Sequence, residues 1–304
     1  MHYVHSTLIT SMPPPLLSII IPTHNRVQIL RQCLDYIEKQ TVRDHLEVIV
    51  VIDGEDQKIV EMFANLSWSF PLTCFAIPKS QQGIARNRGV EHAKGETVLF
   101  IGDDIWLAPQ TCQMHLEAHQ RLAGHSSKAP HHDKAIAVLG FTKWDPGIEI
   151  TPVMQWLDKT GWQFGYESIA QFAHAEIPCS IQHRFTYTSH ISLPREIAWK
   201  IRFREDVDLY GWEDVEWGMR LRDAGVSLFY ESDARAVHHH KLSLQDSLVR
   251  MEKIGRSAKH FEKFCPEFDR VPKGWKLRAY HILALLPTMR GKHARAFLRG
   301  IHTA

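Results

Sequence analysis

The chain has 304 residues, of which 44% are hydrophobic and 23% are charged, with a formal net charge of +2. This length allows one large core or a core with an appended lobe, and the composition excludes an intrinsically disordered chain. No segment has the ~20 apolar residues that a membrane-spanning helix needs. The five cysteines form no CxxC pair, which indicates a reduced, cytoplasmic compartment without disulfides or a thiolate zinc site.

The charge is unevenly distributed along the chain. From Lys241 onward there are 14 basic residues against 5 acidic ones, and residues 271–304 contain seven basic residues and no acidic one. The remaining 240 residues are net acidic and contain no recognised nucleic-acid-binding motif, which argues against a nucleic-acid partner. The basic tail suits either an amphipathic segment on an anionic membrane surface or a helix packed on the rest of the chain with a solvated basic face.

Residues 1–15 lack a basic n-region and a long apolar run, so we expect a flexible leader rather than a signal peptide. Strand and helix patterns then alternate. Continuous apolar runs predict strands at Leu16–Pro22, Leu46–Asp53, Leu72–Ile77, Thr97–Ile101 and Ala135–Phe141. Helical patterns occupy residues 26–40, 56–66 and 83–93, and a further helix starts at Pro109. This order predicts an α/β domain with a mostly parallel sheet flanked by helices.

The second half of the chain is less regular. Residues 142–180 are rich in aromatic residues without a clear period, and we interpret them as a variable insertion over the site. An alternating pattern predicts a strand at Phe185–Pro194, and a glycine ends the predicted helix Glu213–Gly225. A short strand is expected near Ser227–Tyr230, followed by a long helix at Leu244–Phe264.

Polar residues follow four of the predicted strands, where ligands bind in parallel sheets. Asp103 and Asp104 follow the fourth strand. Paired carboxylates at such a position can hold Mg2+ or Mn2+ through oxygen ligands, and this cation would neutralise a diphosphate. Alternatively, they form a polar turn in which one aspartate caps the helix near Pro109.

The residues that follow the first and second strands are further candidates for binding a nucleotide. The first runs into Pro22-Thr23-His24-Asn25-Arg26, which offers hydroxyl, amide and guanidinium groups in place of the glycine-rich turn of a dinucleotide-binding fold. Thr23 or Asn25 could also cap the following helix. Asp53 closes the second strand and could accept a base N–H or a ribose hydroxyl, or it could simply belong to a turn.

Three later motifs supply further candidates. In "GIARNRG" a helix N-terminus suits an anion, with Arg86 and Asn87 facing the site. Glu213 and Asp214 begin a helix, where the macrodipole favours ionised carboxylates and so also suits a general base. His238 begins a run of three histidines, which is a solvated loop unless the fold brings His238 near Asp104 to ligate a metal.

Taken together, these motifs resemble the inverting, GT-A-fold glycosyltransferases of family 2 over roughly Leu16–His240. The resemblance lies in six motifs that occur in order. They are Pro22–Arg26, Asp53, "QQGIARNRG", Gly102-Asp103-Asp104, the Gly211–Leu221 helix and His238. It implies a GT-A catalytic domain at 16–240, with a nucleotide-sugar half (16–141) and an acceptor half (142–240), followed by a basic helical extension at 241–304.

The resemblance also implies a role for each candidate residue. Residues expected to hold the nucleotide of a nucleotide-sugar donor are Pro22, Thr23, Asn25, Arg26, Asp53, Arg86 and Asp103. Asp104 and His238 would ligate Mn2+ or Mg2+. Asp214 would be the base that deprotonates the acceptor hydroxyl, with Glu213 as its nearest rival, and we expect Trp212 to contact a glycan or glycolipid acceptor.

Two departures from the family pattern bear on these roles. Gly102 stands at the first position of the common D-x-D motif, so metal binding depends on Asp104. His190 replaces an asparagine near the acceptor. The expected function is synthesis of a cell-surface polysaccharide or glycolipid by a cytoplasmic enzyme, either free or peripherally bound to the cytoplasmic face of the membrane. The alternative is a non-catalytic nucleotide-sugar or glycan-binding protein of the same fold.

Overall fold

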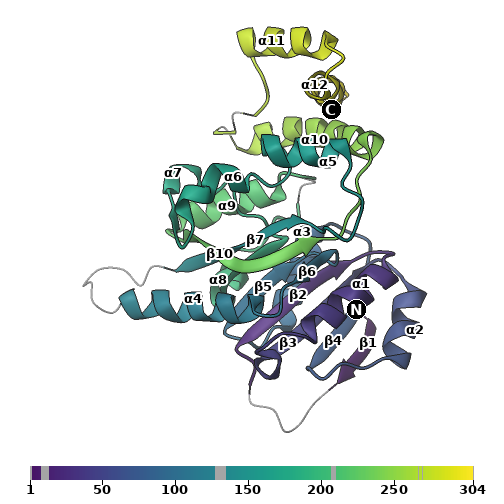
Figure 1. Cartoon of the computed structure of the whole chain (residues 1–304), viewed down its shortest axis with the longest axis vertical. Coiled ribbons are helices and arrows are strands. Elements are labelled where there is room, and N and C mark those ends of the chain that lie inside the picture. The colour runs from purple at the N-terminus through teal and green to yellow at the C-terminus, as the bar shows by residue number, and fades with distance from the viewer. Residues whose placement is uncertain are drawn as a thin grey trace.

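The computed structural model describes residues 2–7, 14–126, 135–206, 210–265, 267–268 and 270–303 (Figure 1). In these residues one ten-stranded sheet crosses the molecule. Its strands, in spatial order, are β1 (His2–Thr7), β4 (Leu72–Ile77), β3 (Leu46–Asp53), β2 (Leu17–Thr23), β5 (Thr97–Ile101), β9 (His190–Pro194), β7 (Ile136–Trp144), β10 (Ser227–His238) and β6 (Ile105–Leu107), with β8 (Ala175–Ile177) beside β10.

The predicted parallel strands form the first half of the ten-stranded sheet. Strands β4, β3, β2 and β5 pair in parallel at the predicted positions, and β7 pairs in parallel with β10. The short β9 joins these two groups by pairing antiparallel with both β5 and β7. The predicted strand at Phe185–Pro194 begins only at His190, because the backbone N–H of Thr188 donates to the Asp214 carboxylate instead of to a neighbouring strand.

Helices cover both faces of the sheet. One face carries α1 (Val27–Ile37), α2 (Gln57–Asn65) and α4 (Thr111–Ser126), and the other carries α3 (Gln82–His92), α6 (Tyr166–Ile169), α8 (Arg195–Lys200) and α9 (Glu213–Asp223). Shorter or peripheral elements are η1 (Arg43–His45), α5 (Pro152–Thr160), η2 (Ala170–Phe172) and α7 (Cys179–Gln182).

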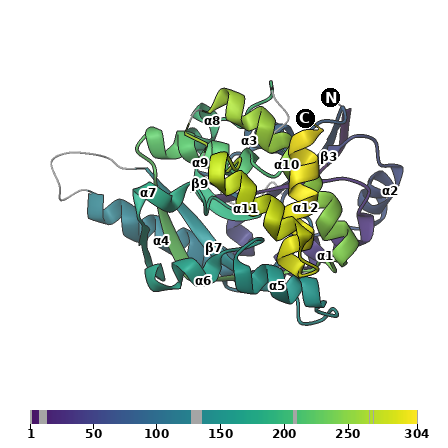
Figure 2. The ribbon, with the colours of Figure 1, turned by 90° about the horizontal axis from the view of Figure 1, so that it is seen from above.

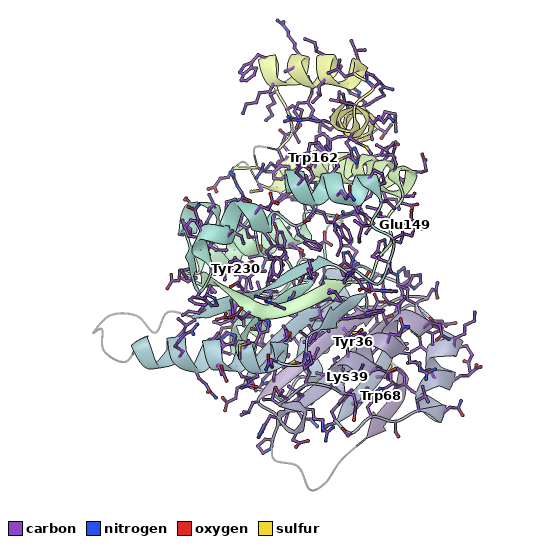
Figure 3. All side chains as sticks on the ribbon, viewed as in Figure 1. Tyr36, Lys39, Trp68, Glu149, Trp162 and Tyr230 are labelled. Atoms are coloured by element: carbon purple, nitrogen blue, oxygen red, sulfur yellow. The ribbon has the colours of Figure 1, made fainter. Side chains whose placement is uncertain are left out.

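Two hydrophobic layers explain the continuous apolar runs of the sequence. Ile19 and Ile21 on β2 contact the core under α1, whereas Ile20 contacts the core under α3. All three side chains are fully buried. Tyr36 lies on the α1 side of the sheet and Tyr230 lies in β10 under α6 (Figure 3). A strand buried on both faces has no solvent-facing positions, so it reads as an uninterrupted apolar segment.

The C-terminal extension consists of α10 (Leu244–Phe264), α11 (Gly274–Leu285) and α12 (Met289–His302). Seen from above, these helices lie over the rest of the molecule (Figure 2). Helices α10 and α12 approach closely at two glycines, since a Cβ on Gly300 would lie 2.0 Å from the Glu252 carbonyl oxygen and one on Gly255 would lie 2.2 Å from that of Phe297. Met219 of α9 joins their hydrophobic cluster, so the extension packs on the α/β part of the chain.

The predicted flexible leader is wrong for residues 2–7. These residues form β1, which pairs antiparallel with the otherwise open edge of β4. An edge strand exposes unpaired N–H and C=O groups, and a further strand satisfies them. Residues 8–13 of the predicted leader lie outside the described residues. No helix in the described ranges is long and apolar enough to cross a membrane.

A chain of buried histidines connects α4 to β9. His115 Nδ1 and His119 Nε2 each lie 2.8 Å from Ser192 Oγ, and His115 Nε2 lies 3.1 Å from His190 Nε2. Burial lowers the pKa of His119 to about 4 and that of His190 to about 3. These imidazoles are therefore neutral in the folded protein at neutral pH.

This burial predicts acid sensitivity. The folded state resists protonation of His119 down to pH about 4, whereas the unfolded state accepts the proton below its ordinary pKa of 6.5. The contribution is complete above pH 6.5 and decreases as the pH falls, by about 2 kcal/mol at pH ~5. Urea unfolding at neutral and acidic pH should therefore show a smaller pH effect in His119→Gln than in wild type. Exposed His281→Gln is the control, and equal pH effects in all three proteins would contradict the assignment.

Candidate functional site

A cavity of about 500 Å3 opens at the carboxyl ends of the central strands. Its walls combine strand ends, the starts of α3 and α9, and Arg250 of α10. Residues predicted from the sequence that line it are Pro22, Thr23, Arg26, Asp53, Arg86, Asp103, Asp104, Glu213, Asp214 and His238. The fold thus brings Asp104, His238 and Asp214, which are distant in the sequence, into one space.

The adjacent aspartates after β5 are held by partners from β2 and the loop that follows it. Thr23 Oγ1 donates to Asp103 Oδ2 at 2.8 Å, and Arg26 Nη1 donates to Asp103 at 3.1 Å and to Asp104 at 2.6 Å. A Cβ on Gly102 would lie 2.9 Å from Asp104 Oδ1, so glycine leaves room for this carboxylate. Neither aspartate caps α4, which begins at Thr111.

The two carboxylates differ in their tendency to ionise. Burial, followed by the negative charge of Asp104, raises the pKa of Asp103 to about 6, against the opposing effects of Arg26 and Thr23. Burial also disfavours ionised Asp104, but His238, His240 and Arg26 outweigh it and hold the pKa of Asp104 well below its usual range. Asp104 is therefore the anionic member of the pair.

Asp104, His238 and His240 form a group that could hold a metal ion. One potential ligand atom from each lies within 4.8 Å of the others. Asp104 Oδ2 is 3.4 Å from His238 Nε2 and 3.3 Å from His240 Nδ1. The His238 ring stacks on Trp144, with centroids 4.9 Å apart, and its buried Nδ1 has no hydrogen-bond partner among the described residues. One carboxylate and two imidazoles suit a divalent transition metal.

Arg86 brings a buried cation to the cavity from the first turns of α3. Its side chain is 2% exposed, and Nη2 lies 3.3 Å from Gln82 Oε1. Within the described residues, its Nε and Nη1 have no hydrogen-bond partner. Burial lowers the pKa of this guanidinium below its ordinary value, and the negative charges of Asp214 and Glu213 oppose that shift. A buried guanidinium with two nitrogens free of hydrogen bonds beside a cavity is suited to an anionic ligand.

Asn87 does not face the cavity as predicted. Its side chain hydrogen-bonds to both backbone groups of Phe203, with Nδ2 2.8 Å from the carbonyl oxygen and Oδ1 2.9 Å from the amide nitrogen. The reason is helical geometry, because consecutive residues of a helix point about 100° apart. Asn87 therefore anchors the loop after α8 while Arg86 lines the cavity.

The first turn of α9 presents two carboxylates. Asp214 Oδ1 accepts a 2.6 Å hydrogen bond from Thr188 Oγ1, and Oδ2 accepts one of 3.2 Å from the Thr188 amide. In contrast, Glu213 Oε2 is buried without a hydrogen-bond partner in the part of the chain that the structure describes. Gly211 precedes them with φ +79°, a left-handed conformation that glycine adopts without strain.

These environments affect the pKa values of Glu213 and Asp214 differently. Burial, together with the charge of Asp214, raises the pKa of Glu213 to about 7. Burial also raises the pKa of Asp214, but Arg86 and the two hydrogen bonds from Thr188 oppose this effect. Asp214 is consequently oriented by Thr188 and its raised pKa is partly offset, whereas Glu213 retains a proton until near neutral pH.

Three predicted residues have different surroundings from those expected. Asp53 lines the cavity, but it accepts hydrogen bonds from Lys79 Nζ at 2.7 Å and the Ser80 amide at 2.6 Å. Asn25 is exposed, has φ +54° and does not line the cavity. Trp212 is also outside its wall, because its indole N–H donates to the Ile254 carbonyl oxygen and its ring joins the α9–α10 cluster.

Neither Thr23 nor Asn25 caps α1. The N-cap is Arg26, which makes no side-chain cap hydrogen bond. The possibility of helix capping at this motif is therefore not realised, and Thr23 instead donates to Asp103.

Sequence reasoning gave no individual role to Thr188, His240 or Arg250 of the cavity wall, and it placed Trp144 and Phe164 there only as part of the aromatic segment 142–180. The run of three histidines could have indicated His240. In an extended chain, residues two positions apart point to the same side, so His240 lies on the side of His238. Arg250 of α10 gave no signal, because it reaches the cavity only through packing of the C-terminal helices. There it donates to Gln163 Oε1.

Comparison with known proteins identifies the family of this chain. Residues 18–129 match the model of the family described as glycosyl transferase family 2. The glycosyltransferase AglE of Haloferax volcanii is 31% identical over 233 residues, which cover 74% of this chain and 67% of that protein. The chain belongs to glycosyl transferase family 2.

A validoxylamine A glucosyltransferase of Streptomyces hygroscopicus subsp. jinggangensis is 26% identical over 232 residues, covering 70% of this chain and 53% of that protein. The similar part covers only 30% of the putative glycosyltransferase EpsH of Bacillus subtilis. This family 2 chain therefore spans between about a third and two thirds of the length of the curated relatives it matches.

Solved structures confirm the predicted GT-A-type fold. A mannosyltransferase from Pyrobaculum calidifontis, PcManGT, in complex with GDP-Man and Mn2+, superposes with a TM-score of 0.61 at 18% identity, covering 96% of this chain and 89% of that one. Residues 1–349 of S. aureus TarS in complex with UDP give a TM-score of 0.51 at 17% identity, with 94% and 90% covered.

The raised pKa of Glu213 predicts that Glu213→Gln stabilises the protein at alkaline pH. Its pKa is about 7 in the folded protein against an ordinary 4.5, so its stabilising contribution is complete below pH 4.5 and is lost as the pH rises through 7. Glutamine has no such loss, and the variant should gain up to about 3 kcal/mol over wild type above pH ~8. Urea unfolding at both pH extremes measures this. Glu196→Gln, at an exposed position, is the control, and an equal gain in both variants would contradict the environment assigned to Glu213.

Proposed function

We propose that this chain transfers a sugar from a nucleotide-diphosphate-sugar donor to an acceptor hydroxyl, with inversion at the anomeric carbon. The observation that carries this proposal is one cavity that joins a candidate cation site, an oriented carboxylate and a buried guanidinium with two nitrogens that lack hydrogen-bond partners among the described residues. The complexes of related folds with GDP-Man and with UDP support a nucleotide-sugar donor.

Donor binding is assigned to the β2–β5 side of the cavity. Arg86 has two unpaired nitrogens and is suited to bind phosphate oxygens. Asp103, with Asp53 nearby on the same wall, would accept hydrogen bonds from the ribose or base. In this proposal Arg26 contributes by holding Asp103 and Asp104 in place.

Asp104, His238 and His240 are proposed to hold a divalent cation, Mn2+ or Mg2+. The donor atoms fit such an ion, because they come from different segments and converge within 4.8 Å. The two imidazoles favour Mn2+ over Mg2+. When bound, the cation would stabilise negative charge on the departing diphosphate. The Mn2+ in the complex of PcManGT supports this assignment.

Asp214 is proposed to act as the general base. Its carboxylate is oriented by Thr188 and would take the proton of the acceptor hydroxyl as the oxygen attacks the anomeric carbon from the face opposite the diphosphate. Glu213 is less suited to this role, since its raised pKa leaves it partly protonated near neutral pH. The proton therefore moves to Asp214, and the leaving group departs as a nucleoside diphosphate.

The acceptor is proposed to be a glycan or glycolipid used in cell-surface polysaccharide or glycolipid synthesis. Trp144 and Phe164 form an apolar wall on the acceptor side, in place of the predicted Trp212. We further propose a cytoplasmic enzyme with peripheral membrane contact through its basic C-terminal region, which has seven basic and no acidic residues over 271–304.

Asp214→Asn tests the general base. Asparagine keeps the shape of the side chain but cannot accept the proton, so turnover of the preferred nucleotide sugar should fall about 10²–10⁴-fold. Donor affinity, measured by calorimetry, should remain close to wild type. The control is Asp223→Asn at the exposed end of the same helix. Wild-type turnover in Asp214→Asn would refute the assignment, and a wild-type protein that binds donors without turnover would favour the non-catalytic alternative.

Asp104→Ala tests the cation site. The variant loses the only carboxylate of the Asp104–His238–His240 group, so Mn2+-dependent donor binding should weaken by roughly tenfold or more. Calorimetry with and without Mn2+ measures the effect. Asp233→Ala is the matched control, because Asp233 belongs to the second His/acid group among the described residues, which lies outside the cavity. Unchanged metal dependence in Asp104→Ala would contradict the proposal.

A further inference from the structure

Helix α11 has a long apolar face that nothing in the described structure covers. The outer face consists of Trp275, Ala279, Ile282 and Leu286, which are spaced to lie along one side of a helix and its C-cap. Trp275 is 74% exposed, Ile282 is 66% exposed and Leu286 is 46% exposed. In Figure 1, α11 is the helix farthest from the sheet.

The opposite side of α11 holds the helix in place by packing against α12. Leu277, Leu283 and Ala284 pack against Ala294 and Leu298 of α12. The helix is therefore apolar on two sides, one of which its neighbour buries. Packing against α12 accounts for the inner residues and leaves the outer face without a structural role.

Exposed basic side chains accompany the outer face on α11 and also occur on the neighbouring helix α12. Lys276 and Arg278 are exposed on α11, and Arg290 and Lys292 are exposed at the start of α12. In the described part of the chain, none of these four has a carboxylate partner. The segment 271–304 contains no acidic residue at all. The surroundings of the outer face thus carry an uncompensated positive charge.

We infer that the outer face of α11 docks on an anionic lipid surface, with Trp275 and Ile282 inserted at the headgroup level. Twelve residues of helix span only about 18 Å, which suits a helix lying in the plane of the interface rather than crossing it. The surrounding basic residues match anionic headgroups. A second copy of the chain is disfavoured, because a two-fold contact through this face would bring the basic segments 271–304 of two copies together without an acidic residue from either segment.

This inference rests on the proposed function in one respect, which is that a lipid-linked acceptor gives the enzyme a reason to bind membranes. The physical link is α10, which packs against α12 and also carries Arg250 to the cavity wall. Docking through α11 would therefore attach the membrane to the same helical layer that borders the proposed acceptor side.

Vesicle co-sedimentation of the full chain tests the inference. Wild type should bind vesicles of equal parts phosphatidylglycerol and phosphatidylcholine, and bind phosphatidylcholine alone much more weakly. Lys276→Gln/Arg278→Gln should lower the partition coefficient roughly 30-fold. Trp275→Ser/Ile282→Ser should lower it at least tenfold, because the inserted apolar area is lost.

Matched controls separate this surface from general effects. Lys58→Gln/Lys94→Gln removes the same charge from exposed positions of the N-terminal half, and Trp199→Ser removes an exposed tryptophan from α8. Both should bind vesicles like wild type. All variants should keep the wild-type thermal midpoint and the wild-type affinity for donor nucleotide.

Several results would overturn the inference. These are equal sedimentation with both vesicle types, wild-type binding by the two α11 variants, or no vesicle binding by wild type. A wild-type dimer that Trp275→Ser/Ile282→Ser dissociates, in the absence of vesicle binding, would assign the outer face to self-association instead. Failure of the proposed function is a distinct outcome, since nucleotide-sugar turnover is measured without vesicles.

Discussion

Burial of negative charge at the carboxyl ends of the sheet is the constraint on which the site depends. Asp103, Asp104, Glu213 and Asp214 stand within one cavity, where each loses hydration that bulk water would supply. The protein compensates with donors and cations from other segments. Arg26 and Thr23 hold the first pair, and Thr188 with Arg86 supports the second.

The buried charged groups of the cavity are not all equally supplied with partners. Asp104 is kept ionised by two histidines and an arginine, while Glu213 is left with an unpaired oxygen and a pKa raised to about 7. Arg86 is the positive counterpart, since it is buried with two unpaired nitrogens among the described residues. Unsatisfied buried groups are costly, so their concentration in one cavity favours a polar ligand that would satisfy them.

The C-terminal helices are part of this arrangement. Close approach at Gly255 and Gly300 fixes α12 on α10, and α10 packs on α9 through Met219 and Phe261. Trp162 contacts the same layer, with its ring centroid 5.9 Å from that of His293 (Figure 3). The extension thus supports the start of α9, where the proposed base lies. It also contributes Arg250 to the cavity wall.

The sequence by itself determined the parallel strands, most of the helices and the residues at the strand ends, because these depend on local apolar patterns and on a general property of parallel sheets. The motifs also indicated the family. The sequence could not determine that Arg26 binds the aspartates or that Thr188 orients Asp214. Nor could it determine that Asn87 anchors a loop while Arg86 lines the cavity.

Only the tertiary structure decided these points, since each is a contact between segments far apart in the chain. The same holds for His240 and Arg250, which reach the cavity through the course of β10 and the packing of α10. It also holds for β1, whose partner is a sheet edge that exists only after folding. Periodicity predicts which side of an element is apolar, but the outer face of α11 shows that only packing decides which apolar side is buried.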